Sequence, residues 1–338
     1  MKKTILFLLL VLMALAAYAQ SAPRGFPAPS SPYVIRHPAL DKYPLKNGGY
    51  DQLNRAAFGL EGDVRKMYIQ TSDMLWEPAS LRDHVIVRFD SLGKVHSSIT
   101  YAHNPIPTGF RYHYREDGQL ERVEKYAWHD GMDGGTDDLD DIYPLQGDAA
   151  RYHYDEDAYL SQIEFLDEDG NVESQHLYSY TADGYNIEIQ YSVETRRLRN
   201  QRFYYNRQGR LIGSQKKDMS GKYIQTATYS YDTKANTITI LQDYLNGQPT
   251  QKTLESYDAS GLLKEKKVND PQGNLMRKYS HTYNGSGWLT KTVYDSPNDK
   301  MTSNYSYETD EHGNVTEYVV TDGKGEEGLR LKIRYEYF

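Results

Sequence analysis

The residue types that most often carry catalysis are absent from this sequence or poorly spaced. There is no cysteine, and neither Gly-x-Ser-x-Gly nor His-Glu-x-x-His occurs. Carboxylates are plentiful, with 47 aspartates and glutamates, but a glycosidase needs two that face each other across a cleft. No pair stands out in that way. We therefore expect a protein that is not an enzyme and that uses no cofactor.

Two histidines, His113 and His153, occupy equivalent places between aromatic residues. In a strand this position belongs to the polar face. Equivalent strands separated by one other strand are at best ~9.6 Å apart, too far for a shared zinc ion with bonds of ~2.1 Å. We interpret both as exposed strand histidines.

A run of six aspartates raises the question of calcium. The spacing does not fit an EF-hand loop, which needs acids at positions 1, 3 and 5, glycine at 6 and glutamate at 12. Two interpretations stay open, a solvated loop and a weak calcium site. The candidate ligands are Asp130, Asp133, Asp137, Asp138, Asp140 and Asp141.

A repeated motif must position any functional side chain of this sequence. The motif consists of a tyrosine, a four-residue turn that ends in glycine, and a leucine. Tyr257-Asp258-Ala259-Ser260-Gly261-Leu262-Leu263 is a clear copy. Asp-x-x-Gly is typical of a type I turn followed by a left-handed residue, which joins antiparallel strands through a bulge. From Tyr154 onward the anchors recur about every 26 residues. The predicted structural turn glycines are Gly93, Gly118, Gly184, Gly209, Gly261 and Gly287.

Several units hold a second turn of the same kind, as at Asp270 to Gly273. Between turns, apolar and charged residues alternate: Leu331, Ile333, Tyr335 and Tyr337 share one face and their neighbours the other. Alternation with a period of two indicates strands rather than helices. Each unit is therefore predicted to be two strands and two tight turns.

This motif and its period resemble the YD repeat of the Rhs (rearrangement hotspot) family, over roughly residues 60 to 338. Leu60-Glu61-Gly62-Asp63-Val64-Arg65 also resembles the start of short secreted Rhs-like proteins. Four positions depart from the pattern. Ala158 and Ala235 replace the turn glycine, and Glu255 and His281 replace the first aromatic residue. Because no toxin domain follows the repeats, the resemblance implies the architecture but not toxin delivery.

The expected fold is all-β. About ten units of two strands give roughly twenty strands, and open sheets of that size usually curl or split. We expect a curved or spiralling antiparallel sheet of repeated β-hairpins, and the alternative is a β-propeller with two units per blade. Whether the sheet closes is left open.

The ends of the chain indicate export. Residues 1–19 read as a signal peptide, with Lys2 and Lys3 before a short apolar run and Ala17-Tyr18-Ala19 at the cleavage site. Residues 20–58 form a proline-rich leader, and residues 59–338 the repeat domain, with an acidic insertion at 127–148. We expect no membrane span after cleavage and, without cysteine, no lipoprotein anchor. The periplasm, the cell surface and the medium all remain possible destinations.

Charge and composition limit the classes of partner that the protein is expected to bind. Loss of Lys2 and Lys3 leaves 37 basic against 47 acidic residues, a sign that disfavours nucleic acid. Repeats offer long surfaces without inherent chemistry, so we expect a non-catalytic structural or protein-interaction scaffold of the cell envelope. The alternative is a carbohydrate-binding module that uses exposed tyrosine and tryptophan, namely Trp76, Trp128 and Trp288.

Overall fold

The protein is all-β, as expected, and its strands belong to one antiparallel sheet. The computed structural model describes Arg55 and residues 60–72, 83–100, 108–127, 144–167, 169–181, 184–191, 199–206, 211–218, 220–245 and 250–338. Within these residues, no helix is long and apolar enough to cross a membrane. The single sheet excludes the alternative of a propeller, whose blades are separate sheets.

Twenty strands follow one another in the part of the chain that the structure describes. The first ten are β1 (Val64–Ser72), β2 (Asp83–Phe89), β3 (Val95–Thr100), β4 (Thr108–Tyr114), β5 (Leu120–Ala127), β6 (Pro144–Tyr154), β7 (Leu160–Leu166), β8 (Val172–Thr181), β9 (Gly184–Tyr191) and β10 (Arg199–Tyr205). The others are β11 (Leu211–Lys217), β12 (Tyr223–Asp232), β13 (Thr237–Tyr244), β14 (Gln251–Tyr257), β15 (Leu263–Asn269), β16 (Leu275–Tyr283), β17 (Leu289–Asp295), β18 (Lys300–Thr309), β19 (Val315–Asp322) and β20 (Glu327–Tyr337).

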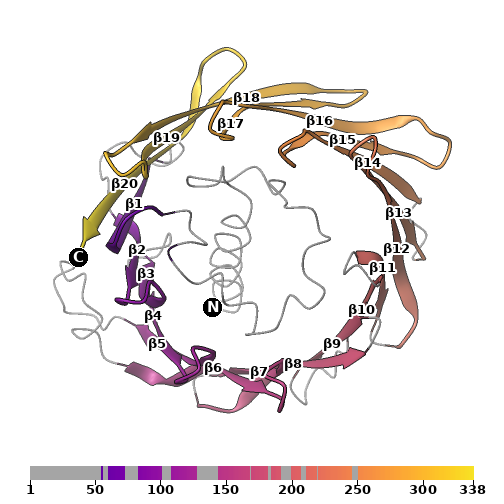
Figure 1. Ribbon diagram of the computed structural model, residues 1–338. Coiled ribbons are helices and arrows are strands. Elements are labelled where there is room, and N and C mark those ends of the chain that lie inside the picture. Colours follow the sequence, from indigo (N-terminus) through magenta and orange to yellow (C-terminus); the bar gives the residue numbers. More distant parts are fainter. Residues whose placement is uncertain are drawn as a thin grey trace.

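Each strand pairs with the next one in sequence, and β1 also pairs with β20. The strands therefore follow a ring (Figure 1), and the expected curved sheet joins its own beginning. A sheet that meets itself has no unpaired edge strand, which removes the usual site of edge-to-edge aggregation.

The β1–β20 seam has the same register as a hairpin. At the turn between β14 and β15, Tyr257 pairs with Leu263, and the next pair skips one residue of β15. At the seam, Tyr337 pairs with Val64, and the next pair again skips one residue, here of β1. The last and first strands thus form a hairpin that lacks a covalent turn.

Backbone geometry supports this description of the seam. In the β14–β15 turn, the amide of Asp258 donates to the carbonyl of Leu262 (2.9 Å), and Gly261 has φ of +82°. At the seam, the amide of Phe338 donates to the carbonyl of Asp63 (3.0 Å), and the preceding Gly62 has φ of +74°. The same bond and the same left-handed glycine appear where the chain is interrupted.

The side chain of Asn314 pins the seam. Its Oδ1 accepts from the amide of Glu61 (2.7 Å), and its Nδ2 donates to the carbonyl of Glu61 (2.9 Å) and to the hydroxyl of Tyr337 (2.8 Å). Asn314 is buried, so its amide replaces the pair of hydrogen bonds that a neighbouring strand would supply.

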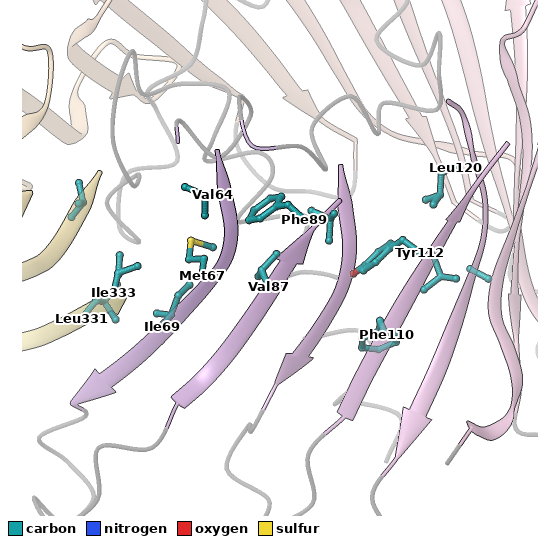
Figure 2. Packing of buried hydrophobic residues seen from close by; sticks show 14 of the residues in the cluster. Val64, Met67, Ile69, Val87, Phe89, Phe110, Tyr112, Leu120, Leu331 and Ile333 are labelled. Atoms are coloured by element: carbon teal, nitrogen blue, oxygen red, sulfur yellow. The ribbon is translucent and has the colours of Figure 1, made fainter. Parts of the chain in front are cut away.

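One face of the sheet is apolar, and the largest cluster of buried residues spans the seam. It joins β17 to β20 with β1 to β7, and it includes Leu331 and Ile333 beside Ile69. Figure 2 shows part of it, with Met67 on β1, Val87 and Phe89 on β2, and Tyr112 on β4. We call this side the apolar face and the opposite side the polar face.

Seven tyrosines among the described residues make the same hydrogen bond on the apolar face. Each hydroxyl donates to the carbonyl of the apolar residue that follows the turn of the preceding unit, at 2.6 to 2.8 Å. The pairs are Tyr114 with Val95, Tyr154 with Leu120, Tyr180 with Leu160, Tyr231 with Leu211, Tyr283 with Leu263, Tyr307 with Leu289 and Tyr335 with Val315.

This bond supplies a partner that the strand ladder does not. The β15–β16 ladder begins at Glu265, which leaves Leu263 beyond its end on that side. A buried carbonyl without a partner is costly, and the hydroxyl of Tyr283 satisfies it. Burial, reinforced by the charge of Asp258, raises the pKa of Tyr283 well above its usual value. The hydroxyl therefore stays protonated and can donate.

The predicted turn glycines behave in three ways. Gly93, Gly118, Gly261 and Gly287 have positive φ, as a left-handed turn position requires. Gly184 instead opens β9 directly opposite Thr181, so this hairpin has a two-residue connection without a bulge, and the predicted turn position is wrong there. Gly209 lies outside the described residues.

At the two turns where alanine replaces the expected glycine, a different residue adopts the left-handed conformation in each case. Ala158 itself adopts the left-handed conformation, with φ of 65°. At the turn with Ala235, the left-handed residue is the following one, Asn236, with φ of 55°. Asparagine tolerates this region better than most residues, and its side chain also donates to the carbonyls of Tyr257 and Asp258.

A first prediction concerns backbone strain at Gly261. A Cβ there would meet nothing within 4 Å, so Gly261→Val tests the positive φ and not a clash. We expect a loss of about 2 kcal/mol in the free energy of unfolding, measured by urea denaturation. Gly285→Val is the control, because Gly285 also has open space but no positive φ. An equal effect at both positions would contradict the turn assignment.

A second prediction concerns the tyrosine–carbonyl bond. Tyr283→Phe should lower the free energy of unfolding by about 1 kcal/mol, because the carbonyl of Leu263 loses its donor. Tyr223→Phe is the control, since Tyr223 is exposed. Equal stability of the two variants would show that the hydroxyl of Tyr283 contributes nothing.

A third prediction tests the seam. Gln70 and Lys332 are direct partners of β1 and β20, and directly opposed residues have Cα separations of about 4.5 to 5.5 Å, within disulfide range. In a chain without cysteine, Gln70→Cys with Lys332→Cys should form one disulfide in air and raise the melting temperature. Gln70→Cys with Lys252→Cys, on the distant β14, should remain reduced. Two free thiols in the first protein would mean that the seam does not form.

Candidate functional site

The two histidines noted in the sequence lie on strands β4 and β6, which are separated by β5. His113 contacts Glu124 (Nε2 to Oε2, 2.9 Å), and His153 contacts Glu164 (3.3 Å). Each partner is on the following strand, so the repeat places a carboxylate beside each imidazole. Among the described residues, no three metal-ligating side chains come together.

Glu124 organises the polar face around His113. It accepts hydrogen bonds from Tyr126 and Arg122, and it lies against the imidazole of the histidine. Burial alone would raise the pKa of Glu124, but these hydrogen bonds outweigh it and lower the pKa to about 2. Arg122 also reaches Asp148 (3.0 Å). Every charge in this group has a partner of opposite sign, which is typical of a structural network rather than of a binding site.

The expected calcium ligands cannot be placed. All six aspartates of the insertion lie outside the described residues, and so do Trp76 and Trp128. The expected insertion at 127–148 begins where β5 ends, and its last residues, from Pro144, already belong to β6. The turn at Asp167 to Gly170 is present as predicted, with the Asp167 carboxylate accepting from the amide of Asn171 (2.8 Å).

A shallow cavity of about 370 Å³ lies on the polar face at the seam. Arg334 covers the ring of Tyr68, with 3.7 Å between its guanidinium carbon and the ring centroid, and the Tyr68 hydroxyl donates to Glu336 (2.7 Å). The aromatic ring is thus already occupied and is not free to stack on a ligand. The lining residues are Tyr68, Gln70, Glu308, Thr316, Glu317, Lys332, Ile333 and Arg334.

The most unusual chemistry lies on the apolar face, at the two units where the repeat lacks its first aromatic residue. Glu255 is only 3 % exposed. Its Oε1 binds the ammonium of Lys266 (3.0 Å), and its Oε2 accepts from the hydroxyl of Tyr257 (2.8 Å). The hydroxyl of Tyr257 is thus directed at a buried carboxylate, whereas the seven tyrosines described above donate to a backbone carbonyl.

His281 is the second departure and is 7 % exposed. Its Nδ1 lies 3.1 Å from the hydroxyl of Thr292, while its Nε2 is buried and has no hydrogen-bond partner among the described residues. Burial, with the positive charge of Lys266, lowers the pKa of His281 to about 4. The imidazole is neutral at pH 7, and its unsatisfied nitrogen costs about 1–3 kcal/mol.

Strand register sets these residues in one row across the apolar face. Glu255 on β14 pairs with Lys266 on β15, and Lys266 pairs with Tyr279 on β16. Tyr279 pairs in turn with Tyr294 on β17, and their ring centroids are 5.2 Å apart. His281 is two residues beyond Tyr279 on the same strand and so shares its face. We call these five residues the charged row.

The charged row was only partly visible in the sequence. The replacement of aromatic residues at Glu255 and His281 was a detectable departure from the repeat. The role of these two residues depends on their neighbours Lys266 and Tyr279. Both neighbours occupy ordinary strand positions, so the sequence gives no reason to single them out. Buried ionisable groups in place of apolar ones lower stability, and proteins commonly retain such groups at functional sites. We therefore take the charged row as the candidate site.

Comparisons with known proteins give fold-level likeness. No protein-family model matches the sequence, and no curated protein does. Similar solved structures include a porin-like protein from Bacteroides uniformis, with 14 % identity over 81 % of this chain and 96 % of that one, and a TM-score of 0.35. A porin-like protein from Bacteroides vulgatus follows, with 13 % identity over 55 % and 93 % of the two chains and a TM-score of 0.33.

A third likeness is to a Tc holotoxin pore structure from Photorhabdus luminescens, with 13 % identity, 72 % of this chain and a TM-score of 0.25. The matched part is 15 % of that toxin chain. At such identities and scores, none of the three bears on function, and the Rhs resemblance stays an expectation from the repeat motif.

A fourth prediction follows from the neutral state of His281. Its pKa is about 4 in the folded protein and about 6.5 when unfolded. The unfolded state thus binds the proton more tightly, and the stability that His281 contributes is complete above pH 6.5 and lost as the pH falls towards 4.

We expect this loss to be about 3 kcal/mol, measured by urea denaturation between pH 7 and pH 4. His281→Phe restores the aromatic residue of the repeat and removes the titrating group. Its stability should fall less steeply over that range. Parallel pH profiles for the two proteins would show that His281 is not held neutral.

Proposed function

We propose that the chain is an exported, non-catalytic β-sheet scaffold that binds a protein partner along one rim of its ring. Support for export comes from the signal-like residues 1–19. The lack of catalysis is supported by the sequence, which holds no catalytic motif, and by the tyrosines, whose hydroxyls are used in repeated structural bonds.

A difference between the two kinds of turn carries the proposal. After the first turn of a unit, the apolar residue is buried, as at Leu160, Leu263 and Leu289. After the second turn, at the opposite end of the strands, the equivalent residue is exposed: Val172 (39 %), Tyr223 (39 %) and Leu275 (37 %). These residues begin β8, β12 and β16. At this position of the motif, the apolar side chain is therefore exposed at only one of the two ends of the strands.

The difference has a cause in strand register. Leu263 pairs with Tyr257 and so lies on the apolar face, whereas Leu275 pairs with Asn269 on the polar face. Exposed positions four strands apart recur at intervals of ~19 Å. Aliphatic side chains such as Val172 and Leu275 do not stack on sugar rings, so this rim favours a protein partner.

Charge substitution tests the proposal. Val172→Lys, Tyr223→Lys and Leu275→Lys together should abolish capture of a partner from surface proteins of the source cells, measured by cross-linking and mass spectrometry. Leu92→Lys is the control, because Leu92 is equally an exposed apolar turn residue but lies at the first-turn end. Identical capture by both variants would sink the proposal.

A further inference from the structure

The charged row combines three features that structural packing does not require. One is a buried nitrogen without a partner, at His281. Another is the ion pair of Lys266 with Glu255, in which the lysine side chain remains 15 % exposed. The third is the half-buried Tyr279–Tyr294 ring pair, whose centroids are 5.2 Å apart. All three lie on one face of β14 to β17, which are side by side in Figure 1.

Arg277 adds a positive charge to this surface. It is two residues before Tyr279 on β16, so it lies on the same face, and it pairs with Val268 of β15. Arg277 is exposed and has no ion-pair partner among the described residues. With Lys266 balanced by Glu255, the surface carries one net positive charge beside two aromatic rings.

We propose that the charged row and Arg277 bind an acidic sugar, whose ring carries a carboxylate. The sugar ring would lie on Tyr279 and Tyr294, with its carboxylate towards the guanidinium of Arg277 and the ammonium of Lys266. A guanidinium matches a carboxylate with two parallel hydrogen bonds. The Nε2 of His281 gains the hydrogen-bond partner that it lacks in the protein alone. This site is separate from the protein-binding rim and does not depend on it.

The chemistry of the surface favours a sugar over an acidic peptide. A carboxylate alone would need only the cations, whereas the adjoining aromatic pair suits the flat faces of a pyranose ring. The apolar face around the row supplies hydroxyl acceptors and donors at Tyr279 and Tyr294. In this respect the site resembles other ligand sites, in which a few polar groups fix the orientation of a body held by apolar contact.

The repeat itself provides the matched variant. Other units hold an aromatic residue at the position of His281, such as Tyr112, Tyr152 and Tyr305. His281→Phe therefore restores the ordinary repeat and should keep or raise the melting temperature while weakening ligand binding at least tenfold. Arg277→Gln should weaken binding by a similar factor without changing the melting temperature. Lys291→Gln, which removes a charge from the other face of β17, is the control and should bind normally.

Titration calorimetry of the mature protein with a glucuronic acid trisaccharide measures binding, with the glucose trisaccharide and the peptide Gly-Glu-Gly as comparators. We expect binding of the acidic trisaccharide alone. Three results would each overturn the proposal: no binding of the acidic sugar at millimolar concentration, equal binding of either comparator, or unchanged affinity in both His281→Phe and Arg277→Gln. Failure here leaves the rim variants of the preceding section unaffected, so the two proposals can fail separately.

Discussion

The pairing of β1 with β20 is the constraint on which the whole sheet depends. Twenty strands in series build up twist and curvature, and the sheet can meet itself only if its first and last strands arrive in matching register. Val64 opposite Tyr337 satisfies that condition. The carboxamide of Asn314 then holds the segment before β1 through both hydrogen-bonding groups of Glu61. Because closure places Ile69 beside Ile333, it also creates a large part of the buried cluster.

Within the ring, the repeated tyrosines supply hydrogen bonds that the strand pairing near the turns leaves out. A bulged turn shifts the register, so the ladder to the next strand starts two residues late. One backbone carbonyl per unit is therefore left without a partner from that ladder. A phenylalanine would bury equally well but could not satisfy that carbonyl, which gives a physical reason for 32 tyrosines against 8 phenylalanines. The unit containing Tyr257 shows the alternative. There the hydroxyl turns to Glu255, and the side chain of Asn236 binds the neighbouring backbone instead.

Local pattern was sufficient to predict the strands, their two faces and most turns, because alternation and Asp-x-x-Gly act over a few residues. Closure was not predictable, since it depends on curvature summed over the whole chain. The turn at Gly184 was misplaced because a two-residue connection and a bulged turn have similar sequences. For the candidate site, the departures at Glu255 and His281 were evident. Their assembly with Lys266, Tyr279 and Tyr294 depends on register across four strands, which no single strand encodes.

The hairpin without a turn at the seam has a consequence for how such a chain can vary. If the closing junction is equivalent to the junctions between Tyr257 and Leu263 or Tyr283 and Leu289, then the position of the chain ends around the ring is arbitrary. Linking residue 338 to residue 60 and cutting at another turn of the same kind would give a rearranged gene for the same ring. Whole units could likewise be duplicated or lost, changing the circumference while every junction keeps its geometry.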